Sequence, residues 1–162
     1  KKIWTNAPFP TRPVTALVDG NTANFFHSQW QTTVEMPHYL VIDLGEEVSA
    51  IKFRSTNTNR VNDSSWKTIN LYTSDSYNPA EWFDGVQFID GNSVDISQAG
   101  THKETTLIEL PDGVDEVYNS EIIPLSKPSR YLWFEVTETT KGTPYFALGE
   151  LEIYQCSMVV LE

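Results

Sequence analysis

The chain has 162 residues, of which 22 are acidic and 11 are basic, and its formal net charge at pH 7 is −11. This length suits one domain with its own core, because domains commonly have about 100–200 residues. Nucleic acids and anionic membrane lipids bind through clustered Lys and Arg, so the charge argues against both as partners. A single cysteine, Cys156, excludes an internal disulfide. No apolar run approaches the roughly 20 residues of a membrane-spanning helix.

The ends of the chain suggest a piece of a larger protein. It opens at Lys1-Lys2-Ile3 without a methionine, and we expect a processed or excised module. The closing pair Leu161-Glu162 has the character of a cloning remnant. No repeat, linker or shift in composition divides the chain, so residues 1–162 are expected to form a single domain.

Short segments of alternating apolar and polar residues dominate the chain and predict strands. In chain order they cover residues 39–44, 48–54, 67–73, 85–90, 105–110, 131–137 and 151–154. Turn-forming residues separate them, among them Gly45 and the pair Lys127-Pro128. A short helical turn is predicted at residues 79–82, inside a long excursion over residues 75–100. Seven or eight short strands at this spacing predict an all-β sandwich or barrel.

The sequence motifs of common enzymes are missing. It contains no Gly-x-Ser-x-Gly, His-Glu-x-x-His, Cys-x-x-Cys or phosphate-binding glycine loop. His38 and His102 are interpreted as ordinary surface or edge residues, without the spacing of a metal site. Acidic pairs such as Glu46-Glu47 are expected by chance among 22 acids, and nothing places two carboxylates face to face as in a glycosidase. We therefore expect a protein that is not an enzyme.

Three segments resemble one known family by their order and spacing. They run from Ala16 to Trp30, from Pro37 to Gly45 and from Pro144 to Tyr154. Together they look like the coagulation factor V/VIII type C, or discoidin, domain, and within it the bacterial family 32 carbohydrate-binding modules. The resemblance covers roughly residues 10 to 155. It implies a galactose-binding-domain-like jelly-roll β-sandwich of about eight antiparallel strands, with loops at one end that hold the ligand.

The turn Asp19-Gly20-Asn21 presents several oxygen atoms on one side, and calcium prefers about six to eight oxygen ligands. The resemblance implies a structural calcium where this turn meets the last strand. Its ligands by position are the carbonyls of Ala16, Asn21 and Gly149, the carboxylates of Asp19 and Glu150, and residue Asn24. Asn24 departs from the Thr or Ser that the family usually has there. Alternatively, Asp19 only caps its turn and Glu150 forms a surface ion pair.

The resemblance also implies a sugar site, where an aromatic face meets the sugar ring and polar groups meet its hydroxyls. The ligand-binding residues by position are His27, Trp30, Arg60, Asn62 and Tyr145. Arg54 is the alternative to Arg60, Phe146 is the alternative to Tyr145, and Asn57 is a further amide in the same loop. In the competing interpretation Trp30 belongs to the core, His27 is a satisfied buried histidine and Tyr145 packs the base of its loop.

Together these observations predict a non-catalytic carbohydrate-binding module for a neutral sugar such as galactose or a relative, with a glycan as its partner. We expect it to be exported, at the cell surface, outside the cell or in the periplasm. One alternative is a protein-interaction or spacer module with a degenerate sugar site, because the loop from Arg54 to Asp63 departs from the family pattern. A lipid-binding discoidin domain is disfavoured by the net charge of −11 and the missing disulfide.

Overall fold

The computed structural model describes residues 2–75, 83–84, 87–88 and 96–156. Its strands are β1 (Lys2–Thr5), β2 (Phe26–His27), β3 (His38–Thr56), β4 (Trp66–Ser74), β5 (Phe83–Asp84), β6 (Gln87–Phe88), β7 (His102–Leu107), β8 (Val117–Asn119), β9 (Ile123–Thr139), β10 (Ala147–Leu148) and β11 (Glu150–Cys156). Two short 3-10 helices are η1 (Val14–Val18) and η3 (Ile96–Ala99). Within these residues every strand pair is antiparallel, so the predicted all-β class is confirmed. None of the helices described is long and apolar enough to cross a lipid bilayer.

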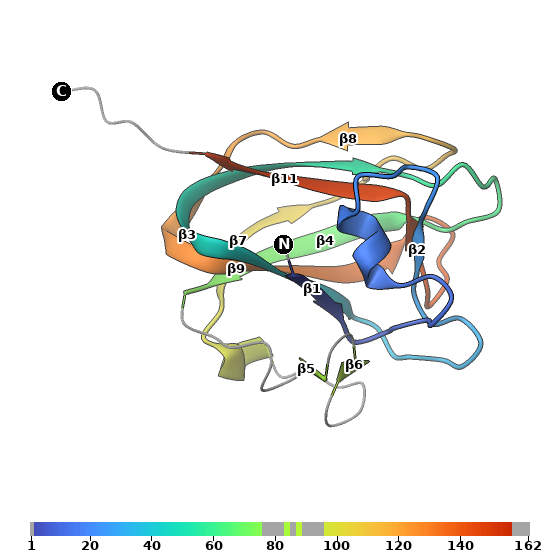
Figure 1. Cartoon of the computed structure of the whole chain (residues 1–162), viewed down its shortest axis with the longest axis horizontal. Coiled ribbons are helices and arrows are strands. Elements are labelled where there is room, and N and C mark those ends of the chain that lie inside the picture. Colours follow the sequence, from blue (N-terminus) through green and yellow to red (C-terminus); the bar gives the residue numbers. More distant parts are fainter. Residues whose placement is uncertain (1, 76–82, 85–86, 89–95, 157–162) are drawn as a thin grey trace.

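Two long strands, β3 and β9, connect the two layers of a β-sandwich. The first half of β3 pairs with β1 and with the end of β9, whereas its second half pairs with β11 and β8. The order is β1-β3-β9-β4-β7, with β11 and β8 also joined to β3. Figure 1 shows β3 curving round one end of the molecule to pass from one layer to the other. The predicted sandwich is therefore confirmed, although its layers share strands.

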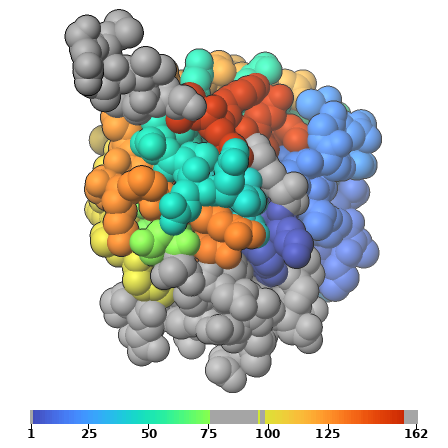
Figure 2. All heavy atoms as spheres, turned by 60° about the vertical axis from the view of Figure 1, so that its left-hand side comes forward, coloured from blue at the N-terminus to red at the C-terminus, as the bar shows by residue number. Residues whose placement is uncertain are grey.

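The prediction of a break at Gly45 is wrong, since β3 continues through it. Gly45 has a φ of 86°, which an L side chain adopts only with strain, and here it lets the strand bend without ending. The register with β9 shifts between Asp43 and Val48, as at a β-bulge. The space-filling view in Figure 2 shows this curved part of β3 beside β9 and β11.

The predicted turn at Lys127-Pro128 is also wrong, because β9 runs through it from Ile123 to Thr139. The pair falls where a second register shift against β3 interrupts the regular ladder, and a proline without an N–H is tolerated there. The predicted strand 105–110 begins earlier, at His102. The short strands β1, β2, β8 and β10 and helix η1 were not predicted. The helical turn at 79–82 and part of the strand at 85–90 lie outside the described residues.

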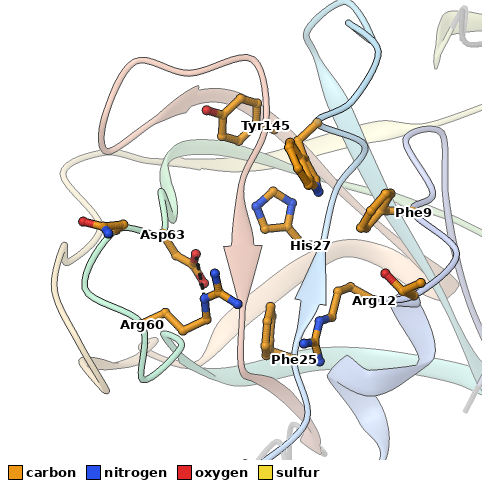
Figure 3. A pocket seen from close by; sticks show the side chains of 10 residues that line it. Phe9, Arg12, Phe25, His27, Arg60, Asp63 and Tyr145 are labelled. Atoms are coloured by element: carbon orange, nitrogen blue, oxygen red, sulfur yellow. Dashed lines mark ion pairs between the residues drawn. The ribbon is translucent and has the colours of Figure 1, made fainter.

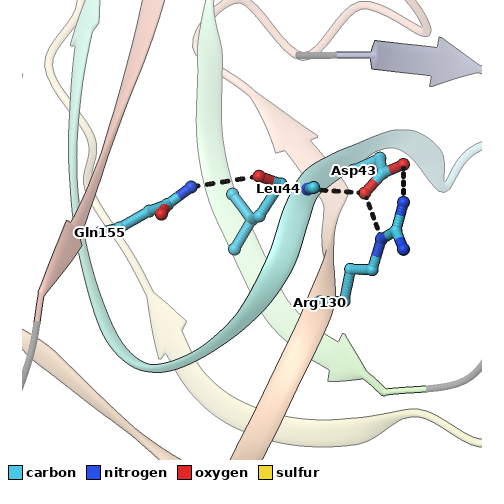
Figure 4. Close-up of polar contacts among 5 residues, drawn as sticks. Asp43, Leu44, Arg130 and Gln155 are labelled. Atoms are coloured by element: carbon cyan, nitrogen blue, oxygen red, sulfur yellow. Dashed lines mark hydrogen bonds and ion pairs between the residues drawn. The ribbon is translucent and has the colours of Figure 1, made fainter.

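Polar contacts hold the bend of β3 in place (Figure 4). The Asp43 carboxylate accepts hydrogen bonds from Arg130 Nε at 2.8 Å, from Arg130 Nη2 at 3.0 Å and from the Gly45 N–H at 2.8 Å. On the other side, Gln155 Nε2 donates to the Leu44 carbonyl at 3.2 Å. The Arg130 hydrogen bond lowers the pKa of Asp43 below its ordinary value, so the folded protein favours the charged carboxylate.

Asp43→Asn is expected to lower the free energy of unfolding by about 1–2 kcal/mol at pH 7, because an amide cannot accept both guanidinium hydrogen bonds. A depressed carboxyl pKa contributes stability above the ordinary pKa of about 4, and that stability is lost as pH falls through the folded value. Urea unfolding of both proteins at pH 7 and pH 3 is therefore expected to show a difference that shrinks at pH 3. Glu47→Gln, exposed at the same bend, is the control. Equal differences at both pH values would contradict this account.

The main core lies between the two layers and follows the period of the strands. Leu40 and Ile42 of β3 and Leu132 and Phe134 of β9 all point into it. Alternate residues of the same strands form a second cluster on the outer face, where they pack against η3; these are Tyr39, Val41, Tyr131 and Trp133, with Ala99 of the helix. Over part of their length, β3 and β9 therefore carry a packed apolar cluster on each of their two faces.

The expectation that His38 lies at the surface or an edge is wrong. His38 begins β3, which is flanked on both sides by β1 and β9, and its side chain is fully buried. Its Nε2 lies 3.0 Å from the Val34 carbonyl oxygen. Burial lowers the pKa of His38, so its neutral form is favoured in the folded protein.

Candidate functional site

The site begins with a short two-stranded sheet that joins two distant segments. In this sheet β2 pairs with β10, with His27 opposite Ala147. The Ser28 N–H donates to the Phe146 carbonyl at 2.9 Å, and the Phe146 N–H donates to Ser28 Oγ at 2.9 Å. These paired bonds bring His27 beside Tyr145, and their ring centroids lie 5.6 Å apart.

The loop after β3 forms a second wall and is held by its own polar contacts. Thr58 Oγ1 donates to Asp63 Oδ2 at 2.8 Å, and Arg60 Nε lies 3.4 Å from Asp63 Oδ1. The Ser64 carbonyl accepts a hydrogen bond from the Ala147 N–H at 2.7 Å, which fixes the loop against β10. The loop is therefore placed against the same short sheet that carries His27.

The segment before η1 supplies the third wall. The Arg12 carbonyl accepts a hydrogen bond from the His27 N–H at 3.3 Å, so this segment runs alongside β2. The three walls border a pocket of about 430 Å³ that is open to solvent. It is lined by Phe9, Thr11, Arg12, Phe25, His27, Trp30, Arg60, Asn62, Asp63 and Tyr145.

All five residues predicted to bind the ligand line this one pocket: His27, Trp30, Arg60, Asn62 and Tyr145. The alternative Arg54 does not line it; its Nη1 lies 3.6 Å from Glu152 Oε2 on the neighbouring strand. The alternative Phe146 is fully buried, and Asn57 Nδ2 donates to the carbonyls of Pro111 and Gly113 instead. Trp30 is 51% exposed, so the interpretation of Trp30 as a core residue is wrong.

Aromatic rings surround His27 on one side of the pocket (Figure 3). Besides Tyr145, the Trp30 centroid lies 6.3 Å and the Phe9 centroid 6.5 Å from the His27 ring. Phe9 and Trp30 also meet edge to face at 5.8 Å. Such a group of rings presents flat apolar surfaces of the kind that cover the C–H face of a sugar.

The hydrogen bonding of His27 determines which of its nitrogens is available to a ligand. Nδ1 lies 2.6 Å from the Ser28 carbonyl oxygen, which can only accept a hydrogen bond. The neutral imidazole therefore carries its proton on Nδ1, and Nε2 is left as an acceptor. Among the described residues no hydrogen bond to Nε2 is found, so this nitrogen is free to accept a hydrogen bond from a ligand hydroxyl.

The other side of the pocket is cationic. The guanidinium carbon of Arg12 lies 4.1 Å from the Phe25 ring centroid, and that of Arg60 lies 5.3 Å from it. Figure 3 shows the two arginines on either side of Phe25. Phe9, Thr11, Arg12, Phe25 and Asp63 were not predicted to line the site. No local motif links residues 9–12 to His27, because that contact arises from the tertiary path of the segment along β2.

The predicted calcium ligands gather where the turn after η1 meets β11. Asp19 Oδ1 accepts a hydrogen bond from the Asn21 N–H at 2.7 Å, and Asp19 Oδ2 accepts one from Asn24 Nδ2 at 2.9 Å. The Glu150 carboxylate comes from the far end of the sequence, and its Oε1 accepts the Gly20 N–H at 3.2 Å. Ala16 is buried in η1 and Gly149 immediately precedes Glu150.

Glu150 does not form the surface ion pair that was the alternative. It is only 5% exposed, and its Oε2 has no hydrogen-bond partner among the residues that the structure describes. Burial, together with the nearby Asp19 charge, raises the pKa of Glu150, whereas the hydrogen bond from Asn24 lowers the pKa of Asp19. Two carboxylates therefore lie together with one buried oxygen left unpaired.

The oxygen atoms of this cluster are of the chemical kind that a hard cation prefers. The described residues contain no group of three or more His, Cys, Asp or Glu side chains that could hold a metal ion. The predicted set needs only two carboxylates, since its other ligands are carbonyl and amide oxygens. The unpaired Glu150 Oε2 beside Asp19 fits such a set. Asn24 now donates its amide N–H to Asp19, and a turn of the amide would present its oxygen instead.

The sequence matches no family model and no curated protein. The structure is similar to that of CpGH89CBM32-5 from Clostridium perfringens, solved in complex with GalNAc-β-1,3-galactose, with a TM-score of 0.69 and 15% identity over 94% of both chains. The family 32 module of C. perfringens NanJ, solved in complex with galactose, has a TM-score of 0.65 and 13% identity over 95% of this chain and 93% of that one.

A third solved structure, CBM32-3 from a family 31 glycoside hydrolase of C. perfringens, has a TM-score of 0.70 and 14% identity over 96% of this chain and 92% of that one. All three are carbohydrate-binding modules, and each aligns with this chain over nearly its whole length. At 13–15% sequence identity, the similarity to these three structures shows a shared fold and not a shared ligand. The chain therefore has the galactose-binding-like β-sandwich fold of the family 32 carbohydrate-binding modules.

Proposed function

We propose that the chain is a non-catalytic carbohydrate-binding module for a neutral sugar such as galactose or a relative. The observation that carries this proposal is the open pocket that unites His27 and Arg60 with aromatic rings, among them the exposed Trp30, at one end of the sandwich. Two neighbours with the same fold were solved with galactose or a galactose-containing disaccharide. Their ligands support the choice of sugar for the first experiments.

Each of the five residues has a task that suits its chemistry. Trp30 and Tyr145 offer flat faces to the apolar side of the ring. His27 Nε2 accepts a hydrogen bond from one hydroxyl, and Arg60, held in place by Asp63, donates a hydrogen bond to another. The amide of Asn62 both donates and accepts. Directional polar groups around an aromatic wall are the usual composition of a small-ligand pocket.

A structural calcium at the turn after η1 is part of the proposal. The carboxylates of Asp19 and Glu150 would hold it together with Asn24 and with the carbonyls of Ala16, Asn21 and Gly149. Calcium would pair with the buried Glu150 Oε2 and link an N-terminal turn to the last strand. In a chain with one cysteine, this link would take the place of a disulfide.

The pocket composition argues against two other functions. A glycosidase needs two carboxylates that flank the scissile bond. Among the described residues, Asp63 is the one acidic residue that lines the pocket, and its carboxylate already contacts Arg60 and accepts a hydrogen bond from Thr58. A spacer with a degenerate site would have a pocket filled by its own loop side chains, whereas this pocket is open and its Trp30 is exposed. We propose that the module tethers a larger exported protein to glycans.

A glycan array probed with the wild-type chain in calcium-containing buffer tests this function. We expect signals on glycans that end in galactose or N-acetylgalactosamine, with a Kd on the order of micromolar to millimolar, because a small polar ligand buries little area. Chitin fragments and glucose polymers are the comparison ligands. An array without any sugar signal would overturn the proposal and favour the spacer alternative.

A further inference from the structure

Arg12 and Arg60 share the Phe25 ring but differ in their charge partners. Arg60 lies 3.4 Å from the Asp63 carboxylate, so its charge is largely compensated. Arg12 forms no ion pair within the part of the chain that the structure describes. Its guanidinium lies 4.1 Å from the Phe25 centroid, and this stacking orients the group without neutralising it.

The pocket therefore has a charge opposite in sign to that of the protein. Its lining side chains include two arginines and one aspartate, in a chain whose net charge is −11. Exposed charges more than about 10 Å apart are largely screened at 0.1 M salt, so the local charge decides which ligand groups are favoured. Locally, this pocket favours an anionic group.

There is room for such a group beside Arg12. A second hollow of about 290 Å³ lies next to the pocket, and Thr11, Arg12 and Phe25 line both. Ala16, Asp19 and Asn24, three of the proposed calcium ligands, line this hollow as well, and both Asp19 oxygens accept hydrogen bonds within their own turn. A substituent of a sugar bound against the aromatic rings can therefore extend toward Arg12.

We propose that the pocket prefers a galactose-like sugar that carries an anionic group, a carboxylate or a sulfate ester, and that Arg12 is the residue that selects it. The inference rests on the proposed sugar-binding function of the same pocket and narrows its preferred ligand from a neutral sugar to an anionic relative of galactose. The aromatic half takes the apolar face of the ring, and the planar N–H pair of Arg12 matches two oxygens of the anionic group. A neutral sugar binds through the other contacts and leaves Arg12 in water.

Calorimetric titration with three related sugars tests the inference. Methyl galactoside is the neutral reference, methyl galacturonide carries a carboxylate on the same ring, and galactose 6-sulfate carries a sulfate ester. For the wild type we expect at least one acidic sugar to bind about fivefold more tightly than methyl galactoside, the advantage of a partly exposed ion pair. The two acidic sugars separate a carboxylate preference from a sulfate preference.

Three variants connect the preference to Arg12. In Arg12→Gln the affinity ratio of acidic to neutral sugar is expected to fall to about one. Arg12→Lys keeps the charge but not the planar donor pair and is expected to retain part of the ratio. Lys103→Gln on β7 removes one positive charge outside the pocket and is expected to keep the wild-type ratio.

The outcomes separate this inference from the proposed function. A wild-type ratio near one, with methyl galactoside bound, overturns the anionic preference alone. A ratio that persists in Arg12→Gln also overturns it, because another group must then select the charge. If none of the three sugars binds the wild type, the sugar-binding function fails and the inference fails with it. A ratio lost in Arg12→Gln and kept in Lys103→Gln supports it.

Discussion

The His27→Ala variant is expected to bind galactose-terminated glycans about 10- to 100-fold more weakly than the wild type. The substitution removes the Nε2 acceptor for a sugar hydroxyl. It also removes the ring that lies between Phe9, Trp30 and Tyr145, with centroids 5.6–6.5 Å away. Since the wild-type Kd is expected to be micromolar or weaker, this loss takes binding to or below the detection limit of a glycan array.

The control for this variant is His102→Ala. His102 lies on β7, which pairs with β4 in the main sheet, and it does not line the pocket. Thermal unfolding of both variants shows whether they remain folded, and the His102 variant is expected to bind like the wild type. If the His27 variant binds a glycan as tightly as the wild type does, the assignment of the site is wrong, although the sugar-binding function stands.

Calcium is expected to raise the melting temperature of the wild type by about 5–10 °C when its concentration is about 100 times its Kd. Binding to the folded state alone gives about 2.7 kcal/mol under that condition, and 1 kcal/mol shifts the melting temperature of a chain of this size by about 2–4 °C. Differential scanning calorimetry in calcium and after chelation measures the shift. The expected cause is that bound calcium would pair with the buried Glu150 Oε2 and would offset the repulsion between Glu150 and Asp19.

Two variants separate calcium binding from general effects of charge. Glu150→Gln keeps an oxygen for the Gly20 N–H but removes the buried charge, so it is expected to be as stable as the wild type after chelation and to gain little from calcium. Asp115→Asn, an exposed change elsewhere, is expected to keep the full calcium shift. A melting temperature that calcium does not change in the wild type, or an equal shift in Glu150→Gln, would contradict the calcium proposal.

The sequence was informative where the pocket is built from short contiguous segments. His27 and Trp30 lie in one such segment and Tyr145 in another, and both segments stay close to the strand ends that carry them. Arg60 was harder to choose, because Arg54 lies only six residues earlier in the sequence. Arg54 belongs to the end of β3, whereas Arg60 belongs to the loop that follows it. In the structure Arg60 lines the pocket, whereas Arg54 lies against Glu152 on the neighbouring strand.

What the sequence alone could not predict depends on partners that are distant along the chain. Gly45 and Pro128 looked like breaks, but the pairing of β3 with β9 continues across bulges at both places. His38 looked exposed because its burial comes from neighbouring strands rather than from its own segment. Arg12 joins the pocket through a backbone hydrogen bond to His27, and no local pattern announces such a contact.

The most direct test of the central claim, that this pocket binds a sugar, is an NMR titration of the ¹⁵N-labelled wild type with methyl galactoside. The account predicts concentration-dependent shifts of the Trp30 indole N–H and of the amides around His27, Arg60 and Tyr145, with little change along β7 at the far edge of the main sheet. Shifts confined to another surface, or a spectrum unchanged up to tens of millimolar sugar, a range beyond the expected Kd, would contradict it.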